Sequence, residues 1–252
     1  MIFGGGRMMM FGLKMISMVG RVARVAAIPA AVCMGLMVAS VAPAAASEEA
    51  SIARGGRLYD KWWAENKAAK PTDDHAAYPN KGGKYGKDVS WRCKECHGWD
   101  YKGKDGAYAS GGHATGIKGI NGAAGKDPAA IVAILKDKTH GYTDAMLSAA
   151  DMGDLALFVS KGQFATALHV DAATKKPKGD AVKGEVYFTT LCAGCHGVDG
   201  KKVVGAPPLG SVADNAVEML HKVTNGQAGE AMPAMRALDR QITVDLVAHL
   251  QT

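Results

Sequence analysis

Two short runs of the sequence place cysteine and histidine side chains in the same order. Residues 93–97 read CKECH and residues 192–196 read CAGCH, and a glycine follows each run. Thiol and imidazole groups at this spacing can form disulfides, bind a metal ion or attach to a cofactor. The sequence predicts whichever of these three uses fits both runs.

Neither disulfides nor a zinc ion accounts for the whole pattern. A disulfide framework has no use for a histidine after each cysteine pair. A zinc ribbon needs its two CxxC pairs about 15–20 residues apart, whereas these runs lie roughly a hundred residues apart. The Cys-x-x-Cys-His pattern does match the attachment site of c-type haem.

The spacing explains how such a run would hold a porphyrin. Residues three apart share one face of a helix, so both thiols of a run can bond the two vinyl groups of one haem. The next residue then supplies an imidazole to the iron. The sequence thus predicts two covalent haem c groups, attached at Cys93 and Cys96 and at Cys192 and Cys195, with His97 and His196 as the proximal iron ligands.

The first 46 residues differ in composition from the rest of the chain. They contain four basic residues, no acidic residue and an apolar run from about Ala26 to Val41, and Ala44 and Ala46 suit a cleavage site before Ser47. This layout predicts a secretory signal peptide at residues 1–46 and a bacterial periplasmic protein; the alternative is an uncleaved membrane anchor. Removing the segment lowers the net charge to about +2, which gives no case for nucleic-acid binding.

The surroundings of the second run resemble the class I cytochromes c. Gly184 and Phe188 lie eight and four residues before Cys192, as in the first helix of that family, where a small and an aromatic residue pack against the last helix. The segment GAPPLG (205–210) is similar to the family's proline loop, whose carbonyl holds the proximal imidazole. Residues 239–252 resemble its closing helix, except that His249 stands where the family usually has an aromatic residue.

The first half repeats this pattern less completely. Residues 128–141 match 215–226, a predicted amphipathic helix that ends at Asn225-Gly226. Residues 147–160 match 238–251, with Ser148 and Asp239 at the expected N-cap positions. The segment ATGIKGI (114–120) stands where the proline loop belongs. Between a starting helix at 55–63 and Cys93 lies an insertion, about 64–90, that we expect to be a surface loop.

The repeat predicts an all-α protein with two tandem class I cytochrome c domains, each wrapped around a covalent haem c. Their expected ranges are residues 47–163 and 181–252, joined by a linker at 164–180. Each domain is small, so the buried porphyrin would supply much of the apolar contact that the chain cannot.

The sixth ligand of each iron sets its potential and its access to substrates. For the second haem the resemblance implies Met232, in the loop before the last helix. For the first haem, alignment from the upstream side matches Met146 to Met232, whereas alignment backward from the closing helix places the ligand beside His140. We favour Met146 and keep His140 as the alternative.

The resemblance to tandem dihaem cytochromes c of the periplasm implies an electron carrier of a respiratory chain rather than an enzyme. Its donor would be a dehydrogenase or a quinol-oxidising complex, and its acceptor an oxidase or reductase; a membrane contact would come only through an uncleaved leader. Two alternatives stay open. One is a cytochrome subunit of a larger dehydrogenase, and the other is a dihaem oxidoreductase of the thiosulfate dehydrogenase or peroxidase kind.

Overall fold

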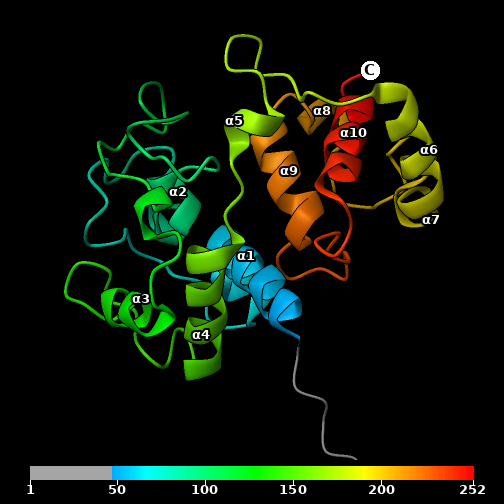
Figure 1. Ribbon diagram of the computed structural model, residues 1–252. Coiled ribbons are helices and arrows are strands. Elements are labelled where there is room, and N and C mark those ends of the chain that lie inside the picture. The colour runs from blue at the N-terminus through cyan, green and yellow to red at the C-terminus, as the bar shows by residue number, and fades with distance from the viewer. Residues whose placement is uncertain (1–46) are drawn as a thin grey trace, which may run out of the picture. The chain divides into compact units, whose positions relative to one another are not determined.

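Helices form all the regular structure of residues 47–252, the part of the chain that the computed structural model describes (Figure 1). The predicted signal peptide, residues 1–46, lies outside the described residues. The all-α prediction is confirmed for this part, where the extended backbone makes only two isolated β-bridges, Gly103–Lys118 and Val170–Pro177. The helices are α1 Glu48–Glu65, α2 Cys93–His97, α3 Pro128–Leu135, α4 Ala149–Leu157, α5 Thr166–His169, α6 Ala181–Leu191, α7 Ala193–His196, α8 Leu209–Val212, α9 Ala216–Asn225 and α10 Arg240–Leu250, with 3-10 turns η1 Lys87–Trp91 and η2 Asn121–Ala123 and a π-turn η3 Phe158–Gly162.

Local sequence features set the ends of these helices. Ser148 and Asp151 form a reciprocal capping box at the start of α4. The Asp239 carboxylate accepts the Gln241 N–H at 2.7 Å at the start of α10. Helix α9 ends at Asn225, followed by Gly226 at φ 90°. The predicted N-caps and this C-terminal stop are confirmed.

In the first half, α1 crosses α4 at a position where glycine is required. A Cβ atom added to Gly55 would lie 2.6 Å from Cβ of Phe158 and would overlap the backbone of Asp154. One helical turn further along α1, the Tyr59 ring lies 5.4 Å from the Phe158 ring. The missing side chain lets the two backbones approach, and the aromatic pair fills the crossing.

The second half contains the same crossing between α6 and α10. A Cβ atom on Gly184 would lie 2.6 Å from the carbonyl carbon of Asp245 and 2.8 Å from Cβ of His249. The Phe188 ring packs 5.5 Å from the His249 ring. His249 therefore fills the aromatic position of the last helix, and the Gly-x-x-x-aromatic element faces an Asp-x-x-x-aromatic element in both halves.

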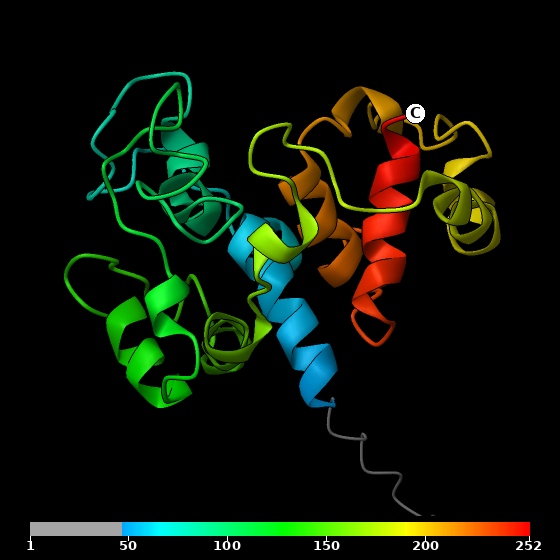
Figure 2. The ribbon, with the colours of Figure 1, turned by 45° about the horizontal axis from the view of Figure 1, so that its top comes forward.

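The two halves meet where α1 lies beside α9, as both ribbon views show (Figure 2). His221 of α9 is fully buried there, with its Nδ1 2.9 Å from the Tyr101 hydroxyl and its Nε2 2.9 Å from the Gly56 carbonyl oxygen. The buried Asp60 carboxylate pairs with Arg92 on one side and with Lys222 on the other. The described residues 47–252 belong to one compact unit, and the predicted domain boundaries stay predictions.

The two segments expected to lack structure are partly ordered. The predicted linker contains α5 and the Val170–Pro177 bridge. Most of the predicted insertion is exposed, but His75 and Tyr78 within it are buried. Within residues 47–252, no helix combines the length and the apolar character needed to span a bilayer.

Candidate haem sites

The first CxxCH run forms the single-turn helix α2, which ends at Gly98 with φ 79°. Cys93 and Cys96 are half-buried and neither is in a disulfide. The Tyr59 hydroxyl donates to the Gly98 carbonyl at 2.6 Å, and Arg92, just before the run, is paired with Asp60. The core thus holds this turn at both ends, with the two thiols one helical turn apart as vinyl attachment requires.

The loop at residues 114–120, which stands where the proline loop belongs, orients the His97 ring. Its Nδ1 lies 2.7 Å from the Lys118 carbonyl oxygen. The loop is tied back to the run through Gly103, which forms a β-bridge with Lys118 and donates its N–H to the His97 carbonyl at 2.8 Å. Burial lowers the pKa of His97 to about 4, so the ring is neutral at pH 7, as an iron ligand must be. With Nδ1–H donated to the carbonyl, Nε2 keeps its lone pair for a metal.

The second run has the same backbone course and fewer protein contacts. Helix α7 ends at Gly197 with φ 77°, and the Lys202 N–H donates to the His196 carbonyl at 2.9 Å, as Gly103 does in the first half. Within the described residues the His196 ring has no hydrogen bond, and the predicted proline loop is exposed. Three apolar side chains near the run also stand exposed, namely Leu191 at 45%, Val198 at 80% and Val204 at 99%.

These surroundings fit a porphyrin. The exposed apolar side chains beside the second run are a surface that a flat apolar group would bury, and the neutral, oriented imidazole of the first run is a ready iron ligand. No group of three or more metal-binding side chains converges within residues 47–252, so the two cysteine pairs are not brought together as one zinc site.

Of the predicted distal residues, the two methionines have similar surroundings, and His140 differs from both. Met232 lies between α9 and α10, half-buried against the core. Met146 is also half-buried against the core, in the turn just before the N-cap of α4. His140 lies in the turn after α3, and its ring centre is 6.3 Å from that of His97.

Sequence reasoning missed two residues that position His140. The buried His75 donates from Nε2 to the His140 carbonyl at 2.9 Å, and the Asp137 carboxylate lies 3.2 Å from Nδ1 of His140. The Asp-x-x-His spacing of 137–140 could have indicated the second contact. Nothing in the sequence indicated the first, because 65 residues separate its partners.

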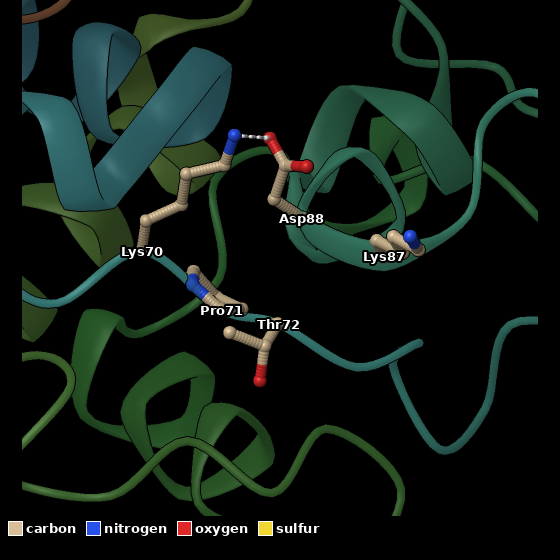
Figure 3. A pocket seen from close by; sticks show the side chains of 5 residues that line it. All are labelled: Lys70, Pro71, Thr72, Lys87 and Asp88. Carbon is tan, nitrogen blue, oxygen red and sulfur yellow. Dashed lines mark ion pairs between the residues drawn. The ribbon is translucent and has the colours of Figure 1, made fainter.

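One surface pocket is lined by residues of the predicted insertion, 64–90. It is lined by Lys70, Pro71, Thr72, Lys87 and Asp88, and Lys70 Nζ pairs with the Asp88 carboxylate at 3.2 Å (Figure 3). Its lining contains no thiol, thioether or imidazole. It therefore carries none of the chemistry of a haem site.

Comparison with known proteins supports the assignment of the second half. Residues 179–250 match the family model of cytochrome c oxidase, cbb3-type, subunit III. No curated protein and no solved structure matches the chain. The matched range contains Cys192, Cys195, His196 and Met232 on the α6–α10 helical frame. The chain therefore contains a c-type cytochrome domain, which implies covalently bound haem c and a role in electron transfer.

Proposed function

We propose that the protein is a periplasmic electron carrier with two covalent haem c groups, one at each CxxCH run. It would relay electrons from a dehydrogenase or quinol-oxidising complex to an oxidase or reductase. The observation that carries the proposal is the helical frame common to both halves. Gly55 and Tyr59 pack on α4 as Gly184 and Phe188 pack on α10, and the second of these frames belongs to the cytochrome c domain.

Corresponding residues would have the same roles in the two halves. The two thiols of a run attach the porphyrin, and the imidazole that follows binds the iron, which supplies reversible one-electron chemistry when bound. At the second run Met232 would be the sixth ligand, which favours a high potential. At the first run the Lys118 carbonyl fixes the His97 ring before any group binds, so little reorganisation is needed there.

Export to the periplasm rests on the predicted signal peptide and on the cysteines. Four cysteines persist after residue 46, all in the two runs, and none is in a disulfide. Both pairs are then available for attachment after export. The partners are inferred from the resemblance to periplasmic dihaem carriers.

The test is to produce the full chain in a host with a haem-attachment system and to count haem and redox steps. We expect two haems per chain, by mass and by the pyridine haemochrome spectrum, and two one-electron waves in a redox titration. One haem per chain would overturn the dihaem proposal. Turnover of thiosulfate or hydrogen peroxide at a rate that reports catalysis would overturn the carrier role in favour of an oxidoreductase.

A further inference from the structure

Two imidazole rings from distant parts of the first half face each other. His97 lies on α2, and His140 lies in the turn after α3, with ring centres 6.3 Å apart and planes inclined by 23°. Both rings are only half-buried. Rings at this distance either stack with an offset or lie on opposite sides of a shared group, and their hydrogen bonds decide between the two.

The spacing is close to that of two imidazoles bound to one metal ion. A metal–imidazole bond is about 2.0 Å long, and in a ring with bonds of about 1.33 Å each nitrogen lies about 1.1 Å from the ring centre. Two rings in line across one ion therefore have centres about 6.2 Å apart, close to the 6.3 Å between His97 and His140. The small angle between the planes is compatible with this arrangement, because both planes can contain the axis through the ion.

The hydrogen bonds leave the same nitrogen free on both rings. Nδ1 of His97 faces the Lys118 carbonyl at 2.7 Å, and Nδ1 of His140 faces the Asp137 carboxylate at 3.2 Å. Of the two neutral tautomers, an oxygen acceptor at Nδ1 selects the one with its proton on that atom, in which Nε2 has the lone pair. Within the described residues neither Nε2 has a hydrogen-bond partner. A metal-bound histidine commonly donates its other N–H to a carbonyl or carboxylate, and both rings are arranged in this way.

The turn that contains His140 is fixed by contacts on its backbone. The Asp137 carboxylate accepts the N–H groups of Thr139 and His140 at 2.8 and 2.9 Å. His75 accepts the Ala77 N–H at its Nδ1, so its Nε2 carries the proton that it donates to the His140 carbonyl. The predicted insertion, through His75, thus holds the His140 turn in place, which gives this segment a structural role.

Met146 has a different environment. Its N–H donates to the Thr143 carbonyl, and its carbonyl accepts from the Asn66 amide at 2.8 Å. Its side chain packs against the hydrophobic core. The backbone of this turn is held on both sides and lies two residues before the N-cap Ser148.

We infer that His140, and not Met146, is the sixth ligand of the haem iron at the first run. The inference rests on the proposed function, since it requires a haem at Cys93 and Cys96. Two imidazoles give a lower potential than an imidazole and a thioether. The first site would then have the lower potential and the second, with Met232, the higher, which orders the sites from the donor to the acceptor.

The experiment compares His140→Ala with Met146→Leu in the full, haem-loaded chain. We expect the wild-type ferric protein to show bis-imidazole and imidazole–thioether signals in electron paramagnetic resonance and near-infrared magnetic circular dichroism. In His140→Ala the bis-imidazole signal should be lost and replaced by a high-spin signal, and added imidazole should restore a low-spin spectrum. In Met146→Leu both signals should be unchanged.

The outcomes separate this inference from the proposed function. A wild-type protein with two imidazole–thioether signals, one of them lost in Met146→Leu, would overturn the assignment of His140 and leave the dihaem carrier intact. A protein with one haem, at the second run, would overturn both. If His140→Ala does not fold, the wild-type spectrum and the Met146→Leu spectrum still decide, because a bis-imidazole signal requires a second histidine at one iron.

Discussion

The two CxxCH runs have a common helical frame but differ in how much protein surrounds them. Around the first run, the Tyr59 hydroxyl holds the Gly98 carbonyl, and the Lys118 carbonyl holds His97. Around the second run, Val198 and Val204 stand almost fully exposed, and the His196 ring has no hydrogen bond within residues 47–252. The helical frame sets the position of each CxxCH run. The loops around a run determine whether its histidine is already oriented before a haem binds.

This difference has a consequence for folding. When a binding site forms only as its ligand binds, the free energy of binding also stabilises the fold around the site. The second half, whose predicted proline loop is exposed, should therefore depend on haem for its stability more than the first half does. The first half already has aromatic residues packed around Tyr59 and Tyr101.

The largest expected effect comes from removing each thiol pair in turn. The Cys93→Ala/Cys96→Ala and Cys192→Ala/Cys195→Ala double variants should each lose one of two haems. The second variant should also lose more helical structure, because its half has fewer protein contacts around the run. Haem per chain and the far-ultraviolet circular dichroism measure the two effects. An unchanged haem content in the first variant would show that its run carries none.

The helical frame can be tested by filling its two crossings. Gly55→Ala and Gly184→Ala should each destabilise the protein by about 1–3 kcal/mol, because the added Cβ meets backbone of the partner helix. The free energy of unfolding in denaturant measures this. Gly153→Ala is the matched control, since it lies within α4 and its Cβ would meet nothing within 4 Å. It should be neutral or stabilising, and equal losses in all three variants would contradict the crossing geometry.

Sequence reasoning succeeded where the information was local. The caps at Ser148 and Asp239 and the stop at Gly226 depend on neighbouring residues, and the structure has all three. The α6–α10 crossing was implied by the resemblance of Gly184 and Phe188 to the first helix of class I cytochromes c, and the structure has this crossing.

The parts that sequence reasoning missed depend on contacts between distant segments. His221 reads as an ordinary residue of an amphipathic helix, but its buried partner Tyr101 lies 120 residues earlier. No periodicity in either segment encodes that pairing. The contact of His75 with the His140 turn was missed for the same reason, since the predicted insertion reads as a polar loop and its buried histidine does not stand out.

The contact between the halves should make stability depend on pH. Burial lowers the pKa of His221 to about 4, whereas in the unfolded chain it is about 6.5. Above the unfolded pKa the ring is neutral in both states. As the pH falls below that value only the unfolded state takes up the proton, so stability is lost until the folded pKa is reached.

The expected loss from this ring is about 2 kcal/mol between about pH 7 and about pH 5. Unfolding in denaturant at both pH values measures it. His221→Gln can still donate and accept a hydrogen bond but does not titrate in this range, so the difference between wild type and variant isolates the ring. An equal pH dependence in both proteins would show that His221 is not held neutral in the folded state.

The smallest expected effect concerns the Asp137 carboxylate, which lies 3.2 Å from Nδ1 of His140. Asp137→Asn keeps an oxygen that accepts the Thr139 and His140 N–H groups, but removes the negative charge that faces Nδ1 of His140. A carboxylate partner raises the basicity of a metal-bound imidazole and so stabilises the more positive iron. The variant should therefore raise the midpoint potential of the first haem and leave that of the second unchanged.

Asp171→Asn is the matched control, because Asp171 accepts the Ala173 and Thr174 N–H groups in a similar turn outside both runs. A redox titration that shows no shift in Asp137→Asn, or the same shift in both variants, would contradict a role for Asp137 through His140.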